Sequence, residues 1–201
     1  MIRCVLSDLG RVIIHFDNSI YYKKIADFSP YSSDQISDLA SAHSSPRRAF
    51  DKGEITPEEF YDQVTAQLDA KIDYDNFYAI YNNVFSLNPP ILEILKRLKG
   101  KYRLVLLSNT DVMRFGFIKK KFPEIMIFDA YVLSYVVGEM KPHPRIFEEA
   151  LKKAEVEAEE CVFIDDIEAY IEAARKLGIK GILMTPQTDL EAALQEMGLS
   201  F

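Results

Sequence analysis

The amino-acid sequence predicts an α/β protein built on a doubly wound, Rossmann-like parallel sheet of five strands, with an all-helical cap inserted after the first strand. Short apolar runs alternate with amphipathic helical patterns along most of the chain, which is typical of a parallel sheet covered by helices on both faces. Between residues 17 and 88 the alternation stops, and helical patterns follow one another without a convincing buried strand. We therefore predict a core domain of residues 1–16 and 89–201 and a helical cap domain of residues 17–88.

The predicted core strands are apolar runs that end at turn-forming or charged residues. They are Ile2–Leu6, Arg103–Leu107, Tyr131–Leu133, Cys161–Ile164 and Lys180–Met184. The helices expected between them show apolar residues on one face. They cover Pro90–Leu98, a stretch from Pro144 to Leu151, Ala169–Leu177 and Asp189–Met197, and the last two end at the natural stops Gly178 and Gly198.

The cap is expected to hold four helices that pack on one another through their many Tyr and Phe side chains. The patterns cover Ile20–Phe28, Ser33–Ala42, Pro57–Leu68 and Tyr74–Phe85. Thr56, followed by Pro57 and two glutamates, is a strong helix-start signal because the threonine hydroxyl can cap the first turn. The stretch from Ser41 to Arg48 has the composition of a loop.

The overall charge restricts the partners that this chain can have. The formal net charge is −7 over 201 residues, which argues against nucleic acid and anionic membrane surfaces as partners. No apolar run is long enough to cross a bilayer, and the first residues lack the order of a signal peptide. The two cysteines, Cys4 and Cys161, lie in buried strands and are expected to be reduced core thiols, so we expect a cytoplasmic protein.

Polar side chains follow several of the predicted strands. Asp8 follows the first strand, Ser108 and Asn109 follow the second, and Asp165 and Asp166 follow the fourth. Doubly wound sheets bind ligands beyond the carboxyl ends of their strands, so these side chains are expected to meet at one edge. The loop before the next helix adds a lysine to this edge, at position 141.

Clustered carboxylates repel one another unless a cation is present. Mg²⁺ is the expected ion, because it takes a few carboxylates and keeps coordination positions for water and substrate oxygens. A hydroxyl, backbone N–H groups and a lysine are suited to the remaining oxygens of a phosphoryl group. The pattern therefore predicts a site for a small phosphorylated ligand.

Four segments in order resemble the signature motifs of the haloacid dehalogenase superfamily. They are Asp8-Leu9-Gly10-Arg11-Val12-Ile13-Ile14, Leu107-Ser108-Asn109-Thr110, Lys141-Pro142 and Phe163-Ile164-Asp165-Asp166. The helical insertion after the first motif resembles the helical cap of one branch of this superfamily. The stretch Phe50-Asp51-Lys52-Gly53-Glu54-Ile55-Thr56 is similar to a cap segment of bacterial sugar-1-phosphate phosphatases, including those for α-glucose 1-phosphate.

The resemblance implies a role for each matching residue. Asp8 would attack phosphorus and form an aspartyl-phosphate, which divides one difficult step into two. The Mg²⁺ ligands would be the Asp8 carboxylate, the Gly10 carbonyl and Asp165, with Asp166 supporting them. The phosphate oxygens would be held by Ser108 and the N–H of Asn109, and Lys141 would neutralise developing charge and orient Asp8.

Three positions depart from the pattern of the superfamily. Gly10 stands where phosphatases usually carry a second aspartate that acts as general acid and base, and Tyr170 stands where relatives often have asparagine. Arg11 stands where close relatives often have asparagine, and it is either a substrate contact or a solvated rim charge. The missing aspartate argues against a phosphomutase. His15 is near in sequence but is better explained as a polar residue at the junction with the cap.

The predicted function is that of a Mg²⁺-dependent phosphatase acting on a small phosphorylated metabolite, with a sugar phosphate as one candidate. An alternative is a 2-haloacid dehalogenase, which would use the same aspartate without a metal. A second alternative is a catalytically weak protein that binds a phosphorylated ligand. The sequence leaves the natural substrate and the oligomeric state open.

Overall fold

The structure, a computed structural model, describes residues 1–41 and 46–201. Its centre is a sheet of five parallel strands in the order β5–β4–β1–β6–β7. The strands are β1 (Cys4–Ser7), β4 (Arg103–Ser108), β5 (Ala130–Leu133), β6 (Cys161–Asp165) and β7 (Lys180–Leu183). The predicted doubly wound sheet is confirmed, and each expected strand forms with slightly different ends.

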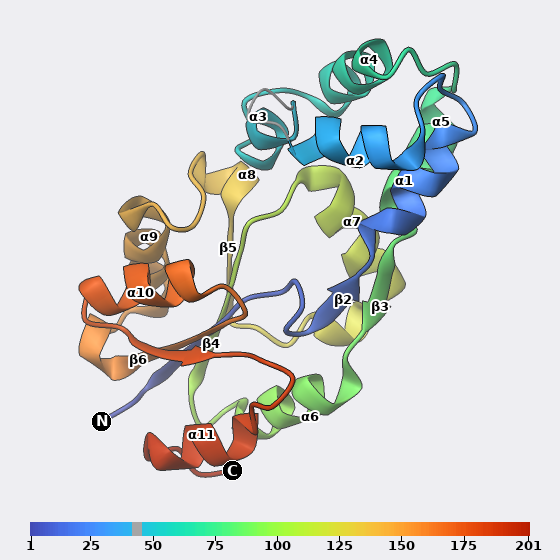
Figure 1. The fold of residues 1–201 in the computed structure, drawn as a ribbon. Coiled ribbons are helices and arrows are strands. Elements are labelled where there is room, and N and C mark those ends of the chain that lie inside the picture. The colour runs from blue at the N-terminus through green and yellow to red at the C-terminus, as the bar shows by residue number, and fades with distance from the viewer. Residues whose placement is uncertain (42–45) are drawn as a thin grey trace.

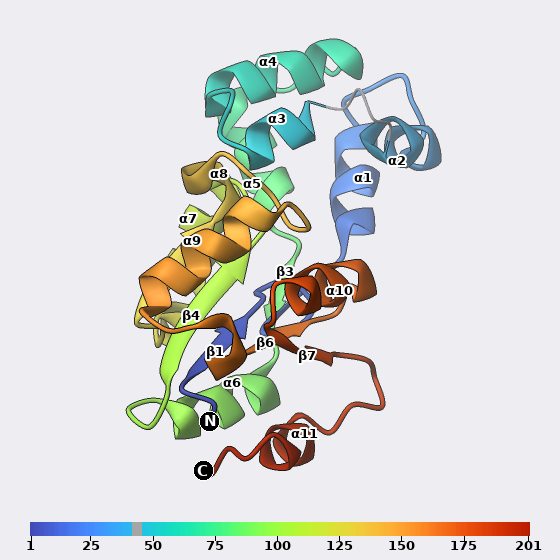
Figure 2. The same cartoon turned by 90° about the vertical axis from the view of Figure 1, so that its left-hand side faces the viewer.

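Helices cover both faces of this sheet (Figures 1 and 2). Successive side chains of a strand point to opposite faces, so Cys4 and Leu6 belong to one buried layer and Val5 belongs to the other. The first layer packs under α9 (Pro144–Ala154) and α10 (Glu168–Lys176). The second packs against α6 (Pro89–Leu98), α7 (Val112–Lys121) and α11 (Leu190–Glu196). Two 3₁₀ turns, η1 (Pro123–Ile125) and η2 (Ala158–Glu160), complete the connections.

A two-stranded antiparallel ribbon carries the chain from the core to the cap helices and back. It pairs β2 (Ile14–Phe16) with β3 (Phe85–Leu87). The helix expected from Tyr74 to Phe85 ends at Asn82 instead, and Phe85 begins β3. The strand is short and Ser86 is exposed, so it carries no apolar run, and its partner lies about 70 residues earlier in the chain.

Five helices of the described residues lie together at the end of the molecule opposite the two chain termini (Figures 1 and 2). They are α1 (Asn18–Ala26), α2 (Ser33–Ser41), α3 (Arg47–Asp51), α4 (Pro57–Gln67) and α5 (Tyr74–Asn82). Helix α3 was not predicted, because its five residues are too few to show a helical period. The loop expected from Ser41 to Arg48 falls partly outside the described residues, and its last two residues belong to α3.

The start of α4 has the predicted chemistry. The Thr56 hydroxyl accepts a hydrogen bond from the N–H of Glu59 at 3.1 Å, and the Glu59 carboxylate accepts one from the N–H of Thr56 at 2.8 Å. This reciprocal pair satisfies backbone donors that a helix start otherwise leaves free. Aromatic rings form the core of the cap, as expected, and Phe50 stacks on Phe60 with ring centres 4.3 Å apart.

The cap touches the core where α3 meets the short helix α8 (Ser134–Val137). Gly53 follows α3 with φ +70°, and a Cβ atom there would lie 2.2 Å from the carbonyl oxygen of Tyr135. Only glycine fits this close approach without strain. An ion pair between Lys52 and Glu139, 3.4 Å long, joins the same two segments. Among the described helices, none is long and apolar enough to cross a membrane.

Candidate active site

The sheet brings three of the predicted site residues to one edge. Strand β1 lies between β4 and β6, and Ser7 is in register with Leu106 on one side and Ile164 on the other. Asp8 follows β1 directly, while Ser108 and Asp165 are the last residues of β4 and β6. Because parallel strands end on the same side, these side chains lie at the carboxyl edge of the sheet.

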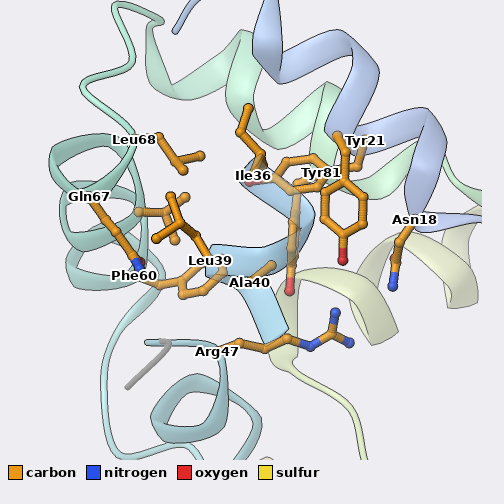
Figure 3. A pocket seen from close by; sticks show the side chains of 12 residues that line it. Asn18, Tyr21, Ile36, Leu39, Ala40, Arg47, Phe60, Gln67, Leu68 and Tyr81 are labelled. Atoms are coloured by element: carbon orange, nitrogen blue, oxygen red, sulfur yellow. The ribbon is translucent and has the colours of Figure 1, made fainter. Parts of the chain in front are cut away.

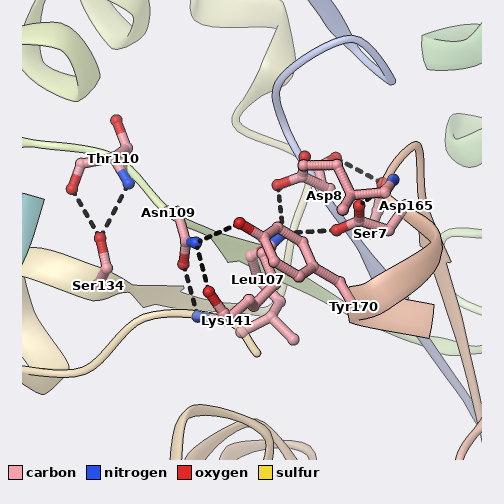
Figure 4. Close-up of polar contacts among 10 residues, drawn as sticks. Ser7, Asp8, Leu107, Asn109, Thr110, Ser134, Lys141, Asp165 and Tyr170 are labelled. Carbon is pink, nitrogen blue, oxygen red and sulfur yellow. Dashed lines mark hydrogen bonds and ion pairs between the residues drawn. The ribbon is translucent and has the colours of Figure 1, made fainter. Parts of the chain in front are cut away.

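Lys141 lies at the centre of this edge (Figure 4). Its Nζ donates hydrogen bonds to Asp8 Oδ1 at 2.7 Å, to Asp165 Oδ2 at 2.6 Å and to the carbonyl oxygen of Leu107 at 3.1 Å. The rings of Phe163 and Tyr170 each lie 5.3 Å from the ammonium nitrogen. Lys141 is only 3% exposed, so its charge is held in one place by named partners.

Burial and charge set the protonation states of this cluster. Burial raises the pKa of Asp8 to about 6, although the ammonium group of Lys141 acts in the opposite direction. Burial acts to lower the pKa of Lys141, but the carboxylates of Asp8 and Asp165 outweigh it and hold that pKa above its usual value. Burial and the Asp165 carboxylate raise the pKa of Asp166. One buried ammonium group therefore faces three carboxyl groups, and further positive charge would stabilise their ionised forms.

The same three carboxyl groups have the geometry of a metal site. Asp8, Asp165 and Asp166 each offer an oxygen atom, and these atoms all lie within 4.8 Å of one another. Among the described residues, no hydrogen bond ends on the carbonyl oxygen of Gly10, which is therefore available as a further ligand. An all-oxygen donor set of this kind fits a hard divalent cation such as Mg²⁺.

The Asn109 side chain has a role that was not predicted from the sequence. Its Oδ1 accepts a hydrogen bond from the N–H of Lys141 at 2.8 Å, and its Nδ2 donates to the carbonyl oxygen of Lys141 at 3.0 Å. Nδ2 also lies 3.4 Å from the hydroxyl oxygen of Tyr170. The side chain thus holds the backbone of Lys141, and only the backbone N–H of Asn109 is left for the predicted phosphate contact.

Replacing Asn109 with alanine is expected to lower kcat by about 10²-fold, because a small displacement of a catalytic group has an effect of this size. The variant removes both hydrogen bonds that position Lys141 but leaves the backbone N–H in place. Steady-state kinetics with an aryl phosphate would measure the loss. Asn83→Ala, at an exposed residue of the cap, is the matched control. An Asn109→Ala enzyme with the kcat of the control would contradict the positioning role.

Arg11 lies beside Asp166 at the rim of the predicted site. Its Nη1 is 3.7 Å from Asp166 Oδ2, its side chain is 64% exposed, and its guanidinium group lies 5.3 Å from the centre of the Phe16 ring. Arg11 and His15 line the same surface cavity, together with Asp166. Arg11 is therefore placed to contact the carboxylate cluster from outside.

A second cavity lies between Gly10 and the end of β4. Its polar lining comes from Ser108, Asn109, Thr110 and two arginines, Arg47 of α3 and Arg114 of α7. The apolar lining is formed by Leu9, Ile14, Phe16, Phe85 and Ile118. The cavity adjoins the predicted phosphate contacts and reaches from the core to the cap, so we name it the leaving-group pocket. Neither arginine was predicted, because nothing in the local sequence around them signals a site.

The Phe16 ring lies close to Gly10. A Cβ atom on Gly10 would lie 3.0 Å from the Cε1 atom of Phe16 and 3.9 Å from Asp8 Oδ2. A side chain at position 10 would therefore require the Phe16 ring to shift by a few tenths of an ångström.

A parallel sheet whose carboxyl edge gathers an aspartate, a lysine and an acidic pair beneath a helical cap defines a class of hydrolases. The sequence model of the haloacid dehalogenase-like hydrolases matches residues 3–178, and the chain belongs to this family. The resemblance noted in the four motifs is thereby confirmed.

Individual relatives match most of this chain. A D-ribitol-5-phosphate phosphatase from Bacteroides thetaiotaomicron is 25% identical over 189 residues, which cover 90% of each protein. A HAD family enzyme from the same organism, in complex with magnesium and inorganic phosphate, superposes with a TM-score of 0.86. The two are 27% identical, and the match covers 96% of this chain and 99% of the other. A drimenol cyclase of Aspergillus calidoustus is 24% identical over 199 residues, and this chain spans 36% of its length.

Proposed function

We propose that this protein is a Mg²⁺-dependent phosphatase that hydrolyses a small phosphorylated metabolite through an aspartyl-phosphate on Asp8. The observation that carries the proposal is the contact of Lys141 with both Asp8 and Asp165, beside a third carboxylate. A carbon-attacking hydrolase needs one aspartate and gains little from two more. Phosphoryl transfer, in contrast, needs concentrated positive charge, which a carboxylate-bound cation and a buried lysine supply.

In the first step an oxygen of Asp8 attacks phosphorus, and the bond from phosphorus to the leaving oxygen breaks. In the second step water attacks the phosphorus of the aspartyl-phosphate, which releases inorganic phosphate and regenerates the Asp8 carboxylate. Ser108 and the backbone N–H of Asn109 bind the non-reacting phosphoryl oxygens. Lys141 holds Asp8 in place and remains cationic, because two carboxylates stabilise its charge.

Magnesium is the cofactor that fits this donor set. Asp8, Asp165, Asp166 and the carbonyl of Gly10 would hold it, and the ion would supply electrostatic stabilisation of the phosphoryl oxygens. The related HAD family enzyme that was crystallised with magnesium and inorganic phosphate supports this assignment.

The leaving oxygen receives its proton from water, since Gly10 cannot supply one and no carboxyl group of the described residues lines the leaving-group pocket. A leaving group of low pKa, such as an anomeric hydroxyl, departs most readily under these conditions. The similarity to D-ribitol-5-phosphate phosphatase supports a sugar or sugar-alcohol phosphate as the substrate. We place the reaction in the cytoplasm, where phosphorylated metabolites are found and the thiols of Cys4 and Cys161 stay reduced.

A panel of phosphate esters tests the proposal. Sugar phosphates, polyol phosphates, nucleotides and an aryl phosphate are incubated with the protein in Mg²⁺ and in a chelator, and phosphate release is measured. We expect release that requires Mg²⁺. Release that is no greater than that of Asp8→Asn would overturn the proposal, and chloride release from a 2-haloacid in chelator would favour the dehalogenase alternative. Ligand binding without any turnover would favour the alternative of a binding protein.

Because the Phe16 ring lies close to Gly10, we expect an acidic side chain at position 10 to need extra space. Gly10→Asp alone is expected to leave hydrolysis of a simple alkyl phosphate unimproved, because the new side chain meets the ring at about 3.0 Å. Gly10→Asp combined with Phe16→Ala is expected to raise that rate by about 10²-fold, the usual contribution of a general acid. The matched control is Phe16→Ala alone. An equal gain in Gly10→Asp alone would show that Phe16 does not exclude the acid.

A further inference from the structure

The leaving-group pocket contains two guanidinium groups that the proposed chemistry does not use. Arg47 comes from the cap helix α3, and Arg114 comes from the core helix α7. Both line the pocket together with Gly10 and Ser108, so both lie on the side to which the leaving group of a phosphate ester would point. No carboxyl group lines this pocket among the described residues.

Arg114 is buried with most of its hydrogen-bonding capacity unused. It is 4% exposed, and among the described residues its guanidinium group donates one hydrogen bond, from Nη2 to Asn18 Oδ1 at 3.2 Å. Its Nε has no hydrogen-bond partner in the described part of the chain and lies 3.9 Å from Asp111 Oδ2. Its Cζ atom lies over the Tyr81 ring, 4.3 Å from the ring centre. Buried donors are normally satisfied, so this arginine is suited to receiving acceptor atoms from a ligand.

Arg47 lies on the boundary between the leaving-group pocket and a cavity inside the cap. Its side chain contributes to the lining of both. Figure 3 shows the Arg47 guanidinium at the end of the cap cavity where the polar ends of Asn18, Tyr21 and Tyr81 also lie. Ile36, Leu39 and Leu68 lie toward the opposite end (Figure 3). The polar end therefore faces the core, and Arg47 joins it to the leaving-group pocket.

The charges behind the two arginines favour a neutral ligand over an anion. Arg47 Nε lies 3.4 Å from Asp51 Oδ2, and Asp111 is the neighbour of Arg114, so each guanidinium group already has a carboxylate beside it. Asp51 is 7% exposed, and its second oxygen has no hydrogen-bond partner within residues 1–41 and 46–201. A further anion would meet these two carboxylates, whereas hydroxyl groups can accept hydrogen bonds from arginine without adding charge.

We propose that Arg47 and Arg114 bind hydroxyl oxygens of the leaving group and so select phosphate esters of polyhydroxylated alcohols over alkyl phosphates. This inference rests on the proposed phosphatase function. One arginine belongs to the cap and the other to the core, so the bound leaving group joins the two parts of the protein. The two arginines contact the leaving group, which differs from one phosphate ester to another. The phosphoryl group is the same in all esters and binds at the same residues.

A substrate series of equal carbon number tests the selection. Values of kcat/KM are measured for D-ribitol 5-phosphate, for n-pentyl phosphate and for the phosphate ester of 5-hydroxypentanoate. We expect wild-type protein to prefer the ribitol ester to the pentyl ester by about 10²-fold or more, as sites built on hydrogen bonds do. Arg47→Leu and Arg114→Leu are each expected to lower this ratio by about tenfold, the value of one hydrogen bond to a charged group.

Arg48→Leu is the matched control, because Arg48 lies in the same helix, is exposed and does not line the pocket. Arg114 is buried, so Arg114→Leu is included only if the variant unfolds cooperatively on heating. If Arg114→Leu does not, the test rests on Arg47→Leu. The inference is overturned if Arg47→Leu and Arg48→Leu show the same preference for the ribitol ester over the pentyl ester. Preference for the carboxylated ester also overturns it and identifies an anion site. In both cases the phosphatase function is still supported if phosphate is released in Mg²⁺. If no ester releases phosphate, the phosphatase function itself is contradicted.

Discussion

Replacement of Asp8 by asparagine is expected to lower Mg²⁺-dependent phosphate release by about 10⁴-fold or more, as removal of a nucleophile does in other hydrolases. The amide has nearly the shape of the carboxylate but lacks the negative charge needed to attack phosphorus. Lys141 keeps its contact with Asp165 at 2.6 Å, so we expect the variant to fold. Turnover of an aryl phosphate at saturating Mg²⁺ measures the effect.

Two controls separate loss of the nucleophile from general damage. Asp75→Asn changes an exposed aspartate of the cap and should retain wild-type turnover. Wild-type protein quenched in acid during turnover should carry a phosphoryl group on the peptide that contains Asp8, and Asp8→Asn should not. A variant that keeps more than about a tenth of wild-type turnover would overturn the assignment, because loss of a covalent nucleophile has a far larger effect.

Replacement of Lys141 by methionine is expected to affect both catalysis and stability. The turnover number should fall by about 10³-fold, the effect of removing one charge-stabilising group from a preorganised site. The free energy of unfolding without Mg²⁺ should fall by about 3–5 kcal/mol, because removing one partner leaves buried carboxylates uncompensated. Both expectations follow from the position of Nζ, within 2.7 Å of Asp8 and Asp165.

Magnesium should recover part of the lost stability in Lys141→Met, because a divalent cation neutralises the same carboxylates. Urea unfolding with and without Mg²⁺ measures this, and the stabilisation by Mg²⁺ should exceed that of the wild type. Lys152→Met, at an exposed residue of α9, is the control for loss of a surface lysine. Wild-type turnover in Lys141→Met, or equal stabilisation by Mg²⁺ in both proteins, would contradict the role given to this lysine.

The arrangement of the charged edge could be predicted because it depends on local sequence. Asp8, Ser108 and Asp165 each come at the end of a buried apolar run, and such runs are recognisable from a few consecutive residues. Parallel strands end on the same side of the sheet, so the fold alone brings those residues together. The chemistry of the edge followed from the residue types, since clustered carboxylates require a cation.

The contacts between the cap and the core could not be predicted in this way. Strand β3 is a strand only because β2 pairs with it across the insertion, and α3 is too short to show a period. Arg47 and Arg114 are 67 positions apart and meet in one pocket only after the cap has closed over the sheet. Residues this far apart share no local pattern that reports their contact.

The sequence by itself determined the doubly wound sheet, the helical insertion and the identity of the charged residues at the sheet edge, because each depends on short-range periodicity and on strand ends. The tertiary structure decided that Asn109 holds the backbone of Lys141, that the Phe16 ring lies beside Gly10 and that two arginines line one pocket with Gly10 and Ser108. These contacts join segments distant in sequence, and packing between segments sets them.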